Sequence, residues 1–392
     1  MTHSFSRRRA LAGGASVAGL SMLSACGTTM PGNLRDLDAD IRNLPIIRAR
    51  TDRIDRITVC LRPFRAVGPR LEVEQVGHKA VVHNYGHGGS GWSLSWGAGQ
   101  MAVERAVTFS KQHIGVIGCG AIGLTTAILA QQAGAQVTIY AESLPPFVRS
   151  ARASGSWTPS SRIAQTSAMT PEFEARWEKM ARFTFSCYQN LQGLPGNPIE
   201  WDNFYGLTSR TPQPEHKDPI GFAKLDNRIQ DIEPQGNRIA IDDPRLPYSS
   251  VHKKPNLIFN VASYSDYLLK QFLERGGRIK IMTLRHPSEL TALPEPVFIN
   301  CTGYGARALW QDESVIPVRG QIAWLIPQPE ALCSLSYENV YVVSRRDGIV
   351  VQWMGDDMSF GFGSTNETPD IAEAHRGVSI LNSLYTKMGY NV

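Results

Sequence analysis

The chain has 392 residues, of which 42% are hydrophobic and 19% are charged, and its formal net charge is +5. This length and composition are typical of a globular protein with about two domains, and they exclude a fibrous or intrinsically disordered chain. Without the first 25 residues, which carry three arginines and no acid, the net charge falls to +2, so charge gives no support for a nucleic-acid partner.

The first 26 residues are predicted to be an export and lipoprotein signal. Three consecutive arginines, Arg7–Arg9, precede a mild apolar stretch that is too short to span a membrane. The arginine pair resembles a twin-arginine signal, and residues 23–26 resemble a bacterial lipobox in which Cys26 becomes lipidated. We therefore expect an exported protein, lipid-anchored on the periplasmic side of the cell envelope; the alternative is a disordered basic N-terminus with a chance cysteine. The other five cysteines lack metal-ligand or paired spacing, so neither a metal site nor a disulfide framework is predicted.

A glycine-rich segment follows the first predicted strands. Alternating apolar and polar residues predict strands between Ile57 and Val82, and residues 83–97 then contain five glycines, two histidines and two tryptophans. Glycines lose much backbone entropy on folding, so such a run is expected where φ is positive or where the backbone approaches a ligand. A glycine-rich surface turn is the alternative. His83 and His87 are interpreted as residues that secure this loop by hydrogen bonds rather than as general bases, and a helix is predicted over residues 98–109.

The strongest single motif lies in residues 114–142. It comprises a strand, a Gly-x-Gly-x-x-Gly turn, a helix, a second strand and an acid, which is the arrangement of a dinucleotide-binding unit. Gly118 permits the tight turn, Gly120 lets the backbone approach the pyrophosphate, and Gly123 lets the helix pack on the strand. The N-terminus of the helix stabilises the phosphate charge, and Glu142 is placed to bind a ribose hydroxyl.

The remaining sequence mixes helices and strands. Further helices are predicted near residues 171–192, over 260–277 and over 371–388. A buried strand at residues 296–300 leads into a second glycine turn at Gly303, which suits a cofactor phosphate or ring edge. Several strands are predicted between residues 318 and 363, with a hairpin turn at residues 345–348.

Several of these segments together resemble the D-amino-acid oxidase family of FAD-dependent enzymes. The matching segments are residues 61–65 (its arginine–proline strand), 83–91 (His-Asn-Tyr-Gly-His-Gly-Gly-x-Gly), 153–159 (Ala-Ala-Gly-x-Trp-x-Pro), 300–303 (Asn-Cys-Thr-Gly) and 319–322 (Arg-Gly-Gln). The resemblance covers nearly all of residues 57–385. It implies a mixed α/β fold, with an FAD-binding Rossmann-like domain and a sheet-rich substrate domain.

The order of the motifs departs from that of the family. In the family the arginine strand and the glycine loop follow the substrate domain near the C-terminus, whereas here they precede the dinucleotide-binding unit. We therefore expect a circularly permuted chain, which can preserve the fold because the ends of natural domains are often close together. Two smaller departures, Asp356–Asp357 in place of paired glycines and Ser344 in place of a proline, are expected to bear on the shape of the side-chain pocket.

The resemblance also implies a division of the chain. We expect a signal (1–26), a tether (27–55), an FAD-binding domain (56–165) that includes the permuted arginine strand and glycine loop, mixed segments of both domains (166–295), an FAD-domain strand and turn (296–320), and a substrate domain (321–392).

The expected site residues follow from the resemblance. Arg62 would clamp the substrate carboxylate with two parallel hydrogen bonds, which its planar guanidinium favours. Tyr341 would hydrogen-bond the same carboxylate, Tyr337 would line or close the pocket, and the carbonyl of Gly89 would accept a hydrogen bond from the substrate amine. The expected cofactor contacts are Gly118, Gly120, Ala121, Ile122, Gly123, Glu142, Ser154, Gly155, Ser156, Trp157, Thr302, Gly303, Gly88, Ser90, Gly91, Trp92 and Ser93.

The activity that this resemblance implies is FAD-dependent oxidative deamination of D-amino acids to 2-oxo acids, ammonia and hydrogen peroxide. The protein would orient the substrate while FAD performs the redox step. Open alternatives are an amino-acid dehydrogenase that uses a membrane electron acceptor instead of oxygen, an oxidase of glycine, N-methyl amino acids or D-aspartate, and a non-catalytic flavin-binding lipoprotein. A homodimer is also left open. An NAD enzyme is the least favoured, because it leaves the other motifs unexplained.

Overall fold

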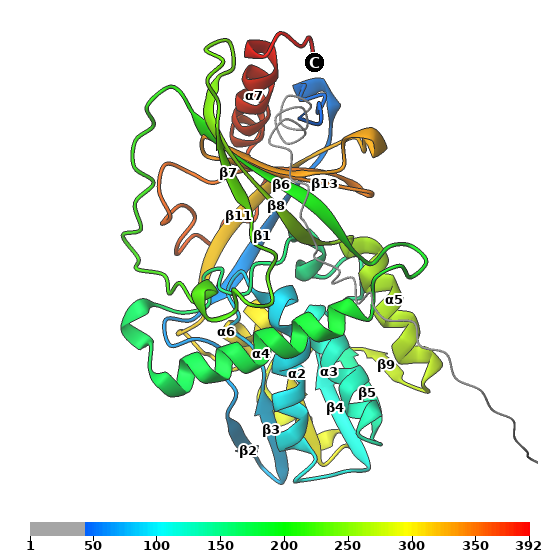
Figure 1. Ribbon diagram of the computed structural model, residues 1–392. Coiled ribbons are helices and arrows are strands. Elements are labelled where there is room, and N and C mark those ends of the chain that lie inside the picture. Colours follow the sequence, from blue (N-terminus) through cyan, green and yellow to red (C-terminus); the bar gives the residue numbers. More distant parts are fainter. Residues whose placement is uncertain (1–43) are drawn as a thin grey trace, which may run out of the picture. The chain divides into compact units, whose positions relative to one another are not determined.

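The structure is a computed structural model that describes residues 44–392 (Figure 1). The predicted signal, with Cys26, lies outside the described residues. Residues Pro45–Val392 form one unit, which is built on two large sheets. Within the described range, none of the helices is both long and apolar enough to cross a membrane.

The first sheet has six strands and carries the predicted dinucleotide-binding unit. Its order is β2 (Val73–Val76), β3 (Lys79–His83), β10 (Val297–Asn300), β4 (His113–Ile117), β5 (Gln136–Ala141) and β9 (Arg278–Ile281). All neighbouring pairs are parallel except the β2–β3 hairpin. The central strands are short apolar runs because both faces of a parallel sheet are covered.

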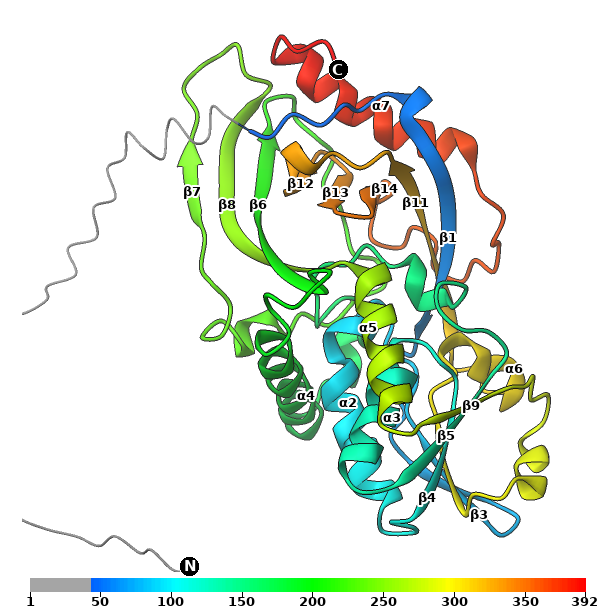
Figure 2. The same cartoon turned by 90° about the vertical axis from the view of Figure 1, so that its right-hand side faces the viewer.

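Four helices cover one face of this sheet. They are α2 (Gly91–Ala106), α3 (Ala121–Gln132), α4 (Pro171–Gln189) and α5 (Val261–Glu274). Helix α2 packs between α3 and α4, and α3 also contacts α5; Figure 2 shows the four helices together on one side of the strands. Their apolar residues and those of the sheet form the largest core cluster of the described chain.

The second sheet has eight strands and is largely antiparallel. Its order is β1 (Ile54–Phe64), β11 (Ile316–Leu325), β14 (Gly348–Trp353), β13 (Val340–Arg345), β12 (Ser334–Tyr337), β6 (Ile199–Ser209), β8 (Tyr248–Phe259) and β7 (Asn237–Ala240), and only β12 and β6 are parallel. Helix α7 (Ile371–Lys387) packs on one face, against β11, β13 and β14. The short helix α6 (Ala306–Leu309) follows β10.

The sequence predicted most of these elements. The helices expected near residues 171–192, 260–277 and 371–388 are confirmed, as is the hairpin between β13 and β14. The helix expected over residues 98–109 is wrong at its start, because α2 begins at Gly91 and takes up the second half of the glycine-rich segment. Glycine and serine are poor helix formers, but almost the whole N-terminal half of α2 is buried, so tertiary packing stabilises it.

The expected domain boundaries need two corrections. The arginine strand was assigned to the FAD-binding domain, but β1 pairs with β11 from Ile54 to Phe64 and so belongs to the eight-stranded sheet. The expected tether is also too long, because Ile47 and Ala49 are fully buried and the Tyr385 hydroxyl donates to the Pro45 carbonyl over 2.9 Å. Neither long-range contact has a signal in the local sequence.

The chain order remains as the sequence analysis described it. Strand β3 precedes the dinucleotide-binding unit in sequence yet lies beside β10, which begins 155 residues after the end of that unit and separates β3 from β4. Helix α2 leads into β4 through a short connection, residues 107–112. Pro45, near the start of the described chain, contacts the C-terminal helix α7. A circular permutation would require these two segments to lie close together, because they would be continuous in the unpermuted chain. The permutation itself stays a prediction.

Candidate active site

A cavity of about 970 Å³ lies between the two sheets. It is bordered by the carboxyl ends of β4, β5 and β10 in the six-stranded sheet and by β1 and β11 in the eight-stranded sheet. Ligands of open parallel sheets bind outside the carboxyl ends of the strands. The position of this cavity therefore matches that of a cofactor, with room for a substrate beside it.

The Gly-x-Gly-x-x-Gly turn forms one wall of the cavity. Gly118 has φ +102° and a Cβ there would lie 2.7 Å from the Cys301 carbonyl oxygen, while a Cβ at Gly123 would collide with the Gly118 carbonyl. Side chains at these two positions would push the helix and strand apart. Gly120 and Glu142 line the cavity as predicted.

The second glycine turn lies beside the first, at the carboxyl end of the neighbouring strand β10. The Thr302 hydroxyl donates to Asn300 Oδ1 over 2.7 Å, which fixes the turn where β10 ends. Gly303 has φ +56°, and both Thr302 and Gly303 line the cavity. Arg149 and Arg152 also line the cavity, and the sequence analysis missed both. Their only signal in the sequence is that two cations follow shortly after Glu142.

The glycine loop lies between the two sheets. The Gly88 N–H donates to the Pro63 carbonyl over 2.8 Å, and the Gly89 N–H donates to the Ser161 carbonyl over 2.9 Å. Gly88 has φ +53°, and a Cβ there would collide with the Arg162 carbonyl. The loop is therefore held on both sides by backbone contacts that only glycine permits.

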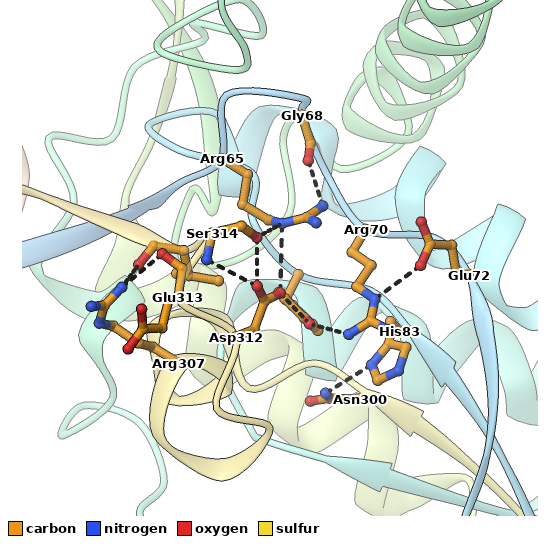
Figure 3. A network of polar contacts seen from close by, with 12 residues as sticks. Arg65, Gly68, Arg70, Glu72, His83, Asn300, Arg307, Asp312, Glu313 and Ser314 are labelled. Carbon is orange, nitrogen blue, oxygen red and sulfur yellow. Dashed lines mark hydrogen bonds and ion pairs between the residues drawn. The ribbon is translucent and has the colours of Figure 1, made fainter.

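A polar network joins the residues around the start of this loop (Figure 3). The Tyr85 hydroxyl donates to Asp312 over 2.7 Å and accepts from Arg70 over 2.9 Å, and Arg65 donates to Ser314 over 2.8 Å. His83 Nε2 lies 2.9 Å from Glu74 and its Nδ1 lies 3.2 Å from the Asn300 amide, so both ring nitrogens have polar partners. The interpretation of His83 as a residue that secures the loop is confirmed.

His87 differs from His83. Its side chain is 2% exposed and lies in the cavity wall. Its Nε2 is buried and has no hydrogen-bond partner among the described residues. Burial lowers the pKa of His87 to about 3, so the imidazole is neutral near pH 7 and its free nitrogen is available to a bound ligand.

Arg62 lies in the part of the cavity wall formed by β1, which is where the sequence analysis expects the substrate and which is called the substrate end below. Its guanidinium covers Gly320 of the neighbouring strand, where any Cβ would collide with it, and Nη1 donates to the Arg319 carbonyl over 3.3 Å. No carboxylate in residues 44–392 forms an ion pair with Arg62, and desolvation lowers its pKa. A desolvated cation without a counter-ion is costly, so this position is suited to an anionic ligand.

The register of the strands puts Tyr341 on the face of the sheet that carries Arg62. Arg62 pairs with Val318 on β11 and Tyr341 pairs with Gln352 on β14, and paired residues point to the same side. Tyr341 is not itself part of the cavity wall, but it packs on the apolar cluster that contains Ile322, which is. The Tyr341 hydroxyl donates to Ser156 Oγ over 2.8 Å, and burial raises its pKa to about 12, so it is protonated near pH 7.

Tyr337 lies on the opposite face, which corrects the prediction that it lines or closes the pocket. It pairs with Val340, one residue away from the Tyr341 pair, and side chains alternate along a strand. This face carries Trp353, against which Gly377 of α7 packs. A one-residue offset is enough to remove Tyr337 from the site.

The other predicted cofactor contacts divide into two groups. Those that line the cavity are Gly88, Gly91, Trp92, Gly118, Gly120, Ala121, Ile122, Glu142, Ser154, Thr302 and Gly303, together with Arg62 and Gly89 of the substrate end. Those that do not line it are Ser90, Ser93, Gly123, Gly155, Ser156 and Trp157. Members of the second group support the wall instead: Ser90 Oγ donates to the Ser161 carbonyl over 3.0 Å, and Ser93 Oγ accepts from the Thr158 N–H over 2.9 Å.

Comparison with known proteins identifies the family. The family described as DAO, FAD dependent oxidoreductase, matches residues 113–387, and the chain belongs to this family. It is therefore an FAD-dependent oxidoreductase. The chain is 28% identical over 255 residues to a D-amino acid oxidase of Dugesia ryukyuensis, covering 61% of this chain and 68% of that protein. It is 25% identical over 292 residues to a D-amino-acid oxidase of Dictyostelium discoideum, covering 71% and 75%.

Solved structures show more distant likeness. One is an L-amino acid deaminase from Proteus vulgaris, with a TM-score of 0.47 and 13% identity over 70% of this chain and 74% of that one. Another is an L-proline dehydrogenase from P. horikoshii, with a TM-score of 0.45 and 16% identity over 70% and 78%.

The residues around the cavity fit FAD. The turn at Gly118 and Gly123 leaves no room for side chains where the pyrophosphate of a dinucleotide approaches the backbone. Glu142, at the end of β5, lines the same end of the cavity and would hold a ribose hydroxyl. At the other end, His87 offers a buried nitrogen without a partner in the described chain, which suits a ligand with polar ring atoms.

Proposed function

We propose that this enzyme oxidatively deaminates D-amino acids. The observation that carries the proposal is Arg62, a desolvated cation with no ion pair in the described chain, in the wall of the cofactor cavity. A guanidinium in this setting binds a carboxylate through two parallel hydrogen bonds. The two curated relatives described above are both named D-amino acid oxidases, which favours this substrate class.

Each residue of the substrate end has a separate task in this proposal. Arg62 binds the α-carboxylate. Tyr341 adds a neutral hydroxyl on the same face of the sheet, and its proton turns from Ser156 Oγ to the carboxylate when the substrate binds. The Gly89 carbonyl accepts from the α-amine; its position is fixed by the Gly89 N–H bond to Ser161. None of these residues transfers a proton from the α-carbon, because they act by orienting the substrate.

FAD, when bound, would supply the redox chemistry of the reaction, in which two electrons of the substrate are transferred to oxygen. The imino acid that results is hydrolysed by water. The overall reaction converts a D-amino acid, O₂ and H₂O into a 2-oxo acid, NH₄⁺ and H₂O₂, which balances in atoms and charge.

An anaerobic titration of the purified flavoprotein tests the proposal. D-alanine, L-alanine and glycine are added in turn while the visible flavin band is recorded. Bleaching by the D-isomer alone, with recovery when air is admitted, supports a D-amino acid oxidase. Bleaching that air does not reverse indicates a dehydrogenase with another acceptor, and bleaching by L-alanine or glycine alone overturns the assignment of substrate.

We also propose that the protein is exported and lipid-anchored through Cys26, on the basis of the sequence pattern alone. Cell fractionation of the natural chain and of its Cys26→Ser variant tests this. We expect the natural chain in the membrane fraction, facing the periplasm, and the variant released from it. Equal distribution of the two chains contradicts the lipid anchor.

A further inference from the structure

A second arginine without an ion pair lies next to the glycine loop, where its carbonyl abuts Gly88, although its side chain is not itself part of the cavity wall. Arg162 is 8% exposed, its Nε is buried without a hydrogen-bond partner, and no ion pair with a described carboxylate compensates its charge. The other most deeply buried arginines are compensated: Arg319 lies 2.6 Å from Glu373 and Arg345 lies 2.8 Å from Asp347. The contact that Arg162 does make is with the face of Phe222, 5.5 Å from its ring centroid.

Arg162 and Arg62 flank the same short piece of the glycine loop. On one side, the carbonyl of Pro63, next to Arg62, accepts from the Gly88 N–H over 2.8 Å. On the other side, the Arg162 carbonyl abuts Gly88, and the preceding Ser161 carbonyl accepts from the Gly89 N–H over 2.9 Å. Gly89 is the residue proposed to bind the substrate amine. The backbone segments that carry the two arginines are therefore both anchored next to Gly89.

An aromatic pair also connects the two arginines. Phe222, over which Arg162 lies, contacts Phe64 edge to face at 5.3 Å between ring centroids. Phe64 is two residues after Arg62 in β1, so its side chain lies on the same face of the sheet. Arg162 is buried against this aromatic pair, and burial increases the cost of leaving its charge without an anion.

The electrostatics agree with this geometry. Burial, and then the positive charge of Arg62, lowers the pKa of Arg162 to about 9. Asp218 is an opposing charge that acts on Arg162, but it forms no ion pair with it and already accepts backbone N–H groups from Ile220, Gly221 and Phe222. Arg162 also has φ +50°, a backbone conformation that is uncommon outside glycine and is often retained at functional sites.

We infer that Arg162 binds a second carboxylate of the substrate, so that the preferred substrates are acidic amino acids. This inference rests on the proposed function, because it takes the α-carboxylate to be bound by Arg62. A substrate with two carboxylates places one negative charge at each arginine. An amino acid with a neutral side chain has one carboxylate, which binds to Arg62, so the positive charge of Arg162 is left without a counter-ion.

The first test compares ligands that differ by a single carboxylate and that are not oxidised. Succinate and butyrate have the same carbon chain, so each is titrated into the purified flavoprotein while the change in the flavin band is recorded. We expect succinate to bind about 100-fold more tightly than butyrate, because a charge-assisted hydrogen-bonded pair is worth one to two powers of ten in affinity. Equal affinities overturn the inference.

The second test uses variants of Arg162 with D-aspartate, D-asparagine and D-alanine as substrates. Arg162→Asn removes the charge and suits the left-handed backbone, and Arg162→Lys retains the charge. We expect Arg162→Asn to lower kcat/KM for D-aspartate about 100-fold and for D-alanine less than about threefold, with Arg162→Lys between the natural chain and Arg162→Asn. Equal losses for both substrates at unchanged flavin content overturn the inference.

Two readouts keep the outcomes separate. Flavin content and melting temperature show whether each variant folds, and Arg245→Asn, whose side chain is 87% exposed, is the matched surface control. If succinate binds tightly and Arg162→Asn abolishes that preference while no D-amino acid bleaches the flavin, the second anion site stands and the proposed function fails. If D-alanine is oxidised and succinate binds no better than butyrate, the proposed function stands and the inference fails.

Discussion

The two ends of the cavity are built in different ways. The cofactor end consists of backbone turns, and its main elements, Gly118 to Glu142, lie within one short stretch of sequence. The substrate end consists of side chains from strands far apart in the chain, such as Arg62 on β1 and Tyr341 on β13. Local sequence therefore specifies the first, whereas strand register specifies the second. The variants below are ordered from the largest expected effect to the smallest, and they test whether the two ends can be perturbed separately.

The largest effect is expected at the cofactor end. Gly123→Ala places a Cβ against the Gly118 carbonyl and forces the helix away from the turn. We expect the purified variant to contain little or no flavin, measured by its visible absorbance. Gly134→Ala is the control, because a Cβ added at Gly134 has no atom within 4 Å. Gly134 has φ +93°, so this variant should lose about 1 kcal/mol of stability and keep its flavin. A fully loaded Gly123→Ala protein would contradict this account of the turn.

At the substrate end, Arg62→Met is expected to remove substrate binding while flavin binding is retained. We expect kcat/KM to fall about 100-fold or more, mainly through KM, because the carboxylate loses a charged, bidentate partner. The melting temperature should not fall, since the variant removes a desolvated cation that lacks an ion pair. An unchanged KM, or a lost flavin, would show that Arg62 does not belong to a separate substrate end.

His87 lies where the two ends meet, and its effect is on stability. Burial lowers its folded-state pKa from 6.5 to about 3, so below about pH 6.5 the unfolded chain gains a proton that the folded chain does not. The contribution of neutral His87 to the free energy of unfolding is fully present above pH 6.5 and is lost as the pH falls towards 3. At pH 5 this loss is about 2 kcal/mol.

The variant His87→Gln should therefore show a smaller fall in melting temperature between pH 7 and pH 5 than the natural chain. His375→Gln, on the exposed side of α7, is the control and should follow the natural chain. If the melting temperatures of the natural chain and of His87→Gln fall equally between pH 7 and pH 5, His87 is protonated in the folded protein without loss of stability.

The smallest effect separates the two tyrosines. Tyr341→Phe removes a hydroxyl on the Arg62 face, and we expect kcat/KM to fall about tenfold, the effect of one hydrogen bond. Tyr337→Phe changes a residue on the α7 face and should leave kcat/KM unchanged. The ratio of kcat/KM between the two variants is the measurement, and a larger loss in Tyr337→Phe would show that the register assigned to β12 and β13 is wrong.

The sequence allowed the cofactor end to be predicted almost completely. A positive φ, a close backbone approach and an acid after the second strand each require particular residues at fixed spacings, so the spacing alone was enough to assign Gly118, Gly120 and Glu142. The FAD-dependent class, the mixed α/β fold and most helices followed from the same kind of local pattern.

Only the tertiary structure decided the rest. Strand pairing placed β1 in the eight-stranded sheet, and a one-residue offset sent Tyr337 to the face opposite Tyr341. Arg162 carried no sequence signal, because the absence of a counter-ion becomes visible only after folding has placed every carboxylate of the described chain. Backbone geometry is dictated by neighbouring residues, whereas the environment of a side chain depends on residues that are distant in the sequence. For this reason the cofactor of this protein could be inferred from its sequence, whereas its substrate has to be tested by experiment.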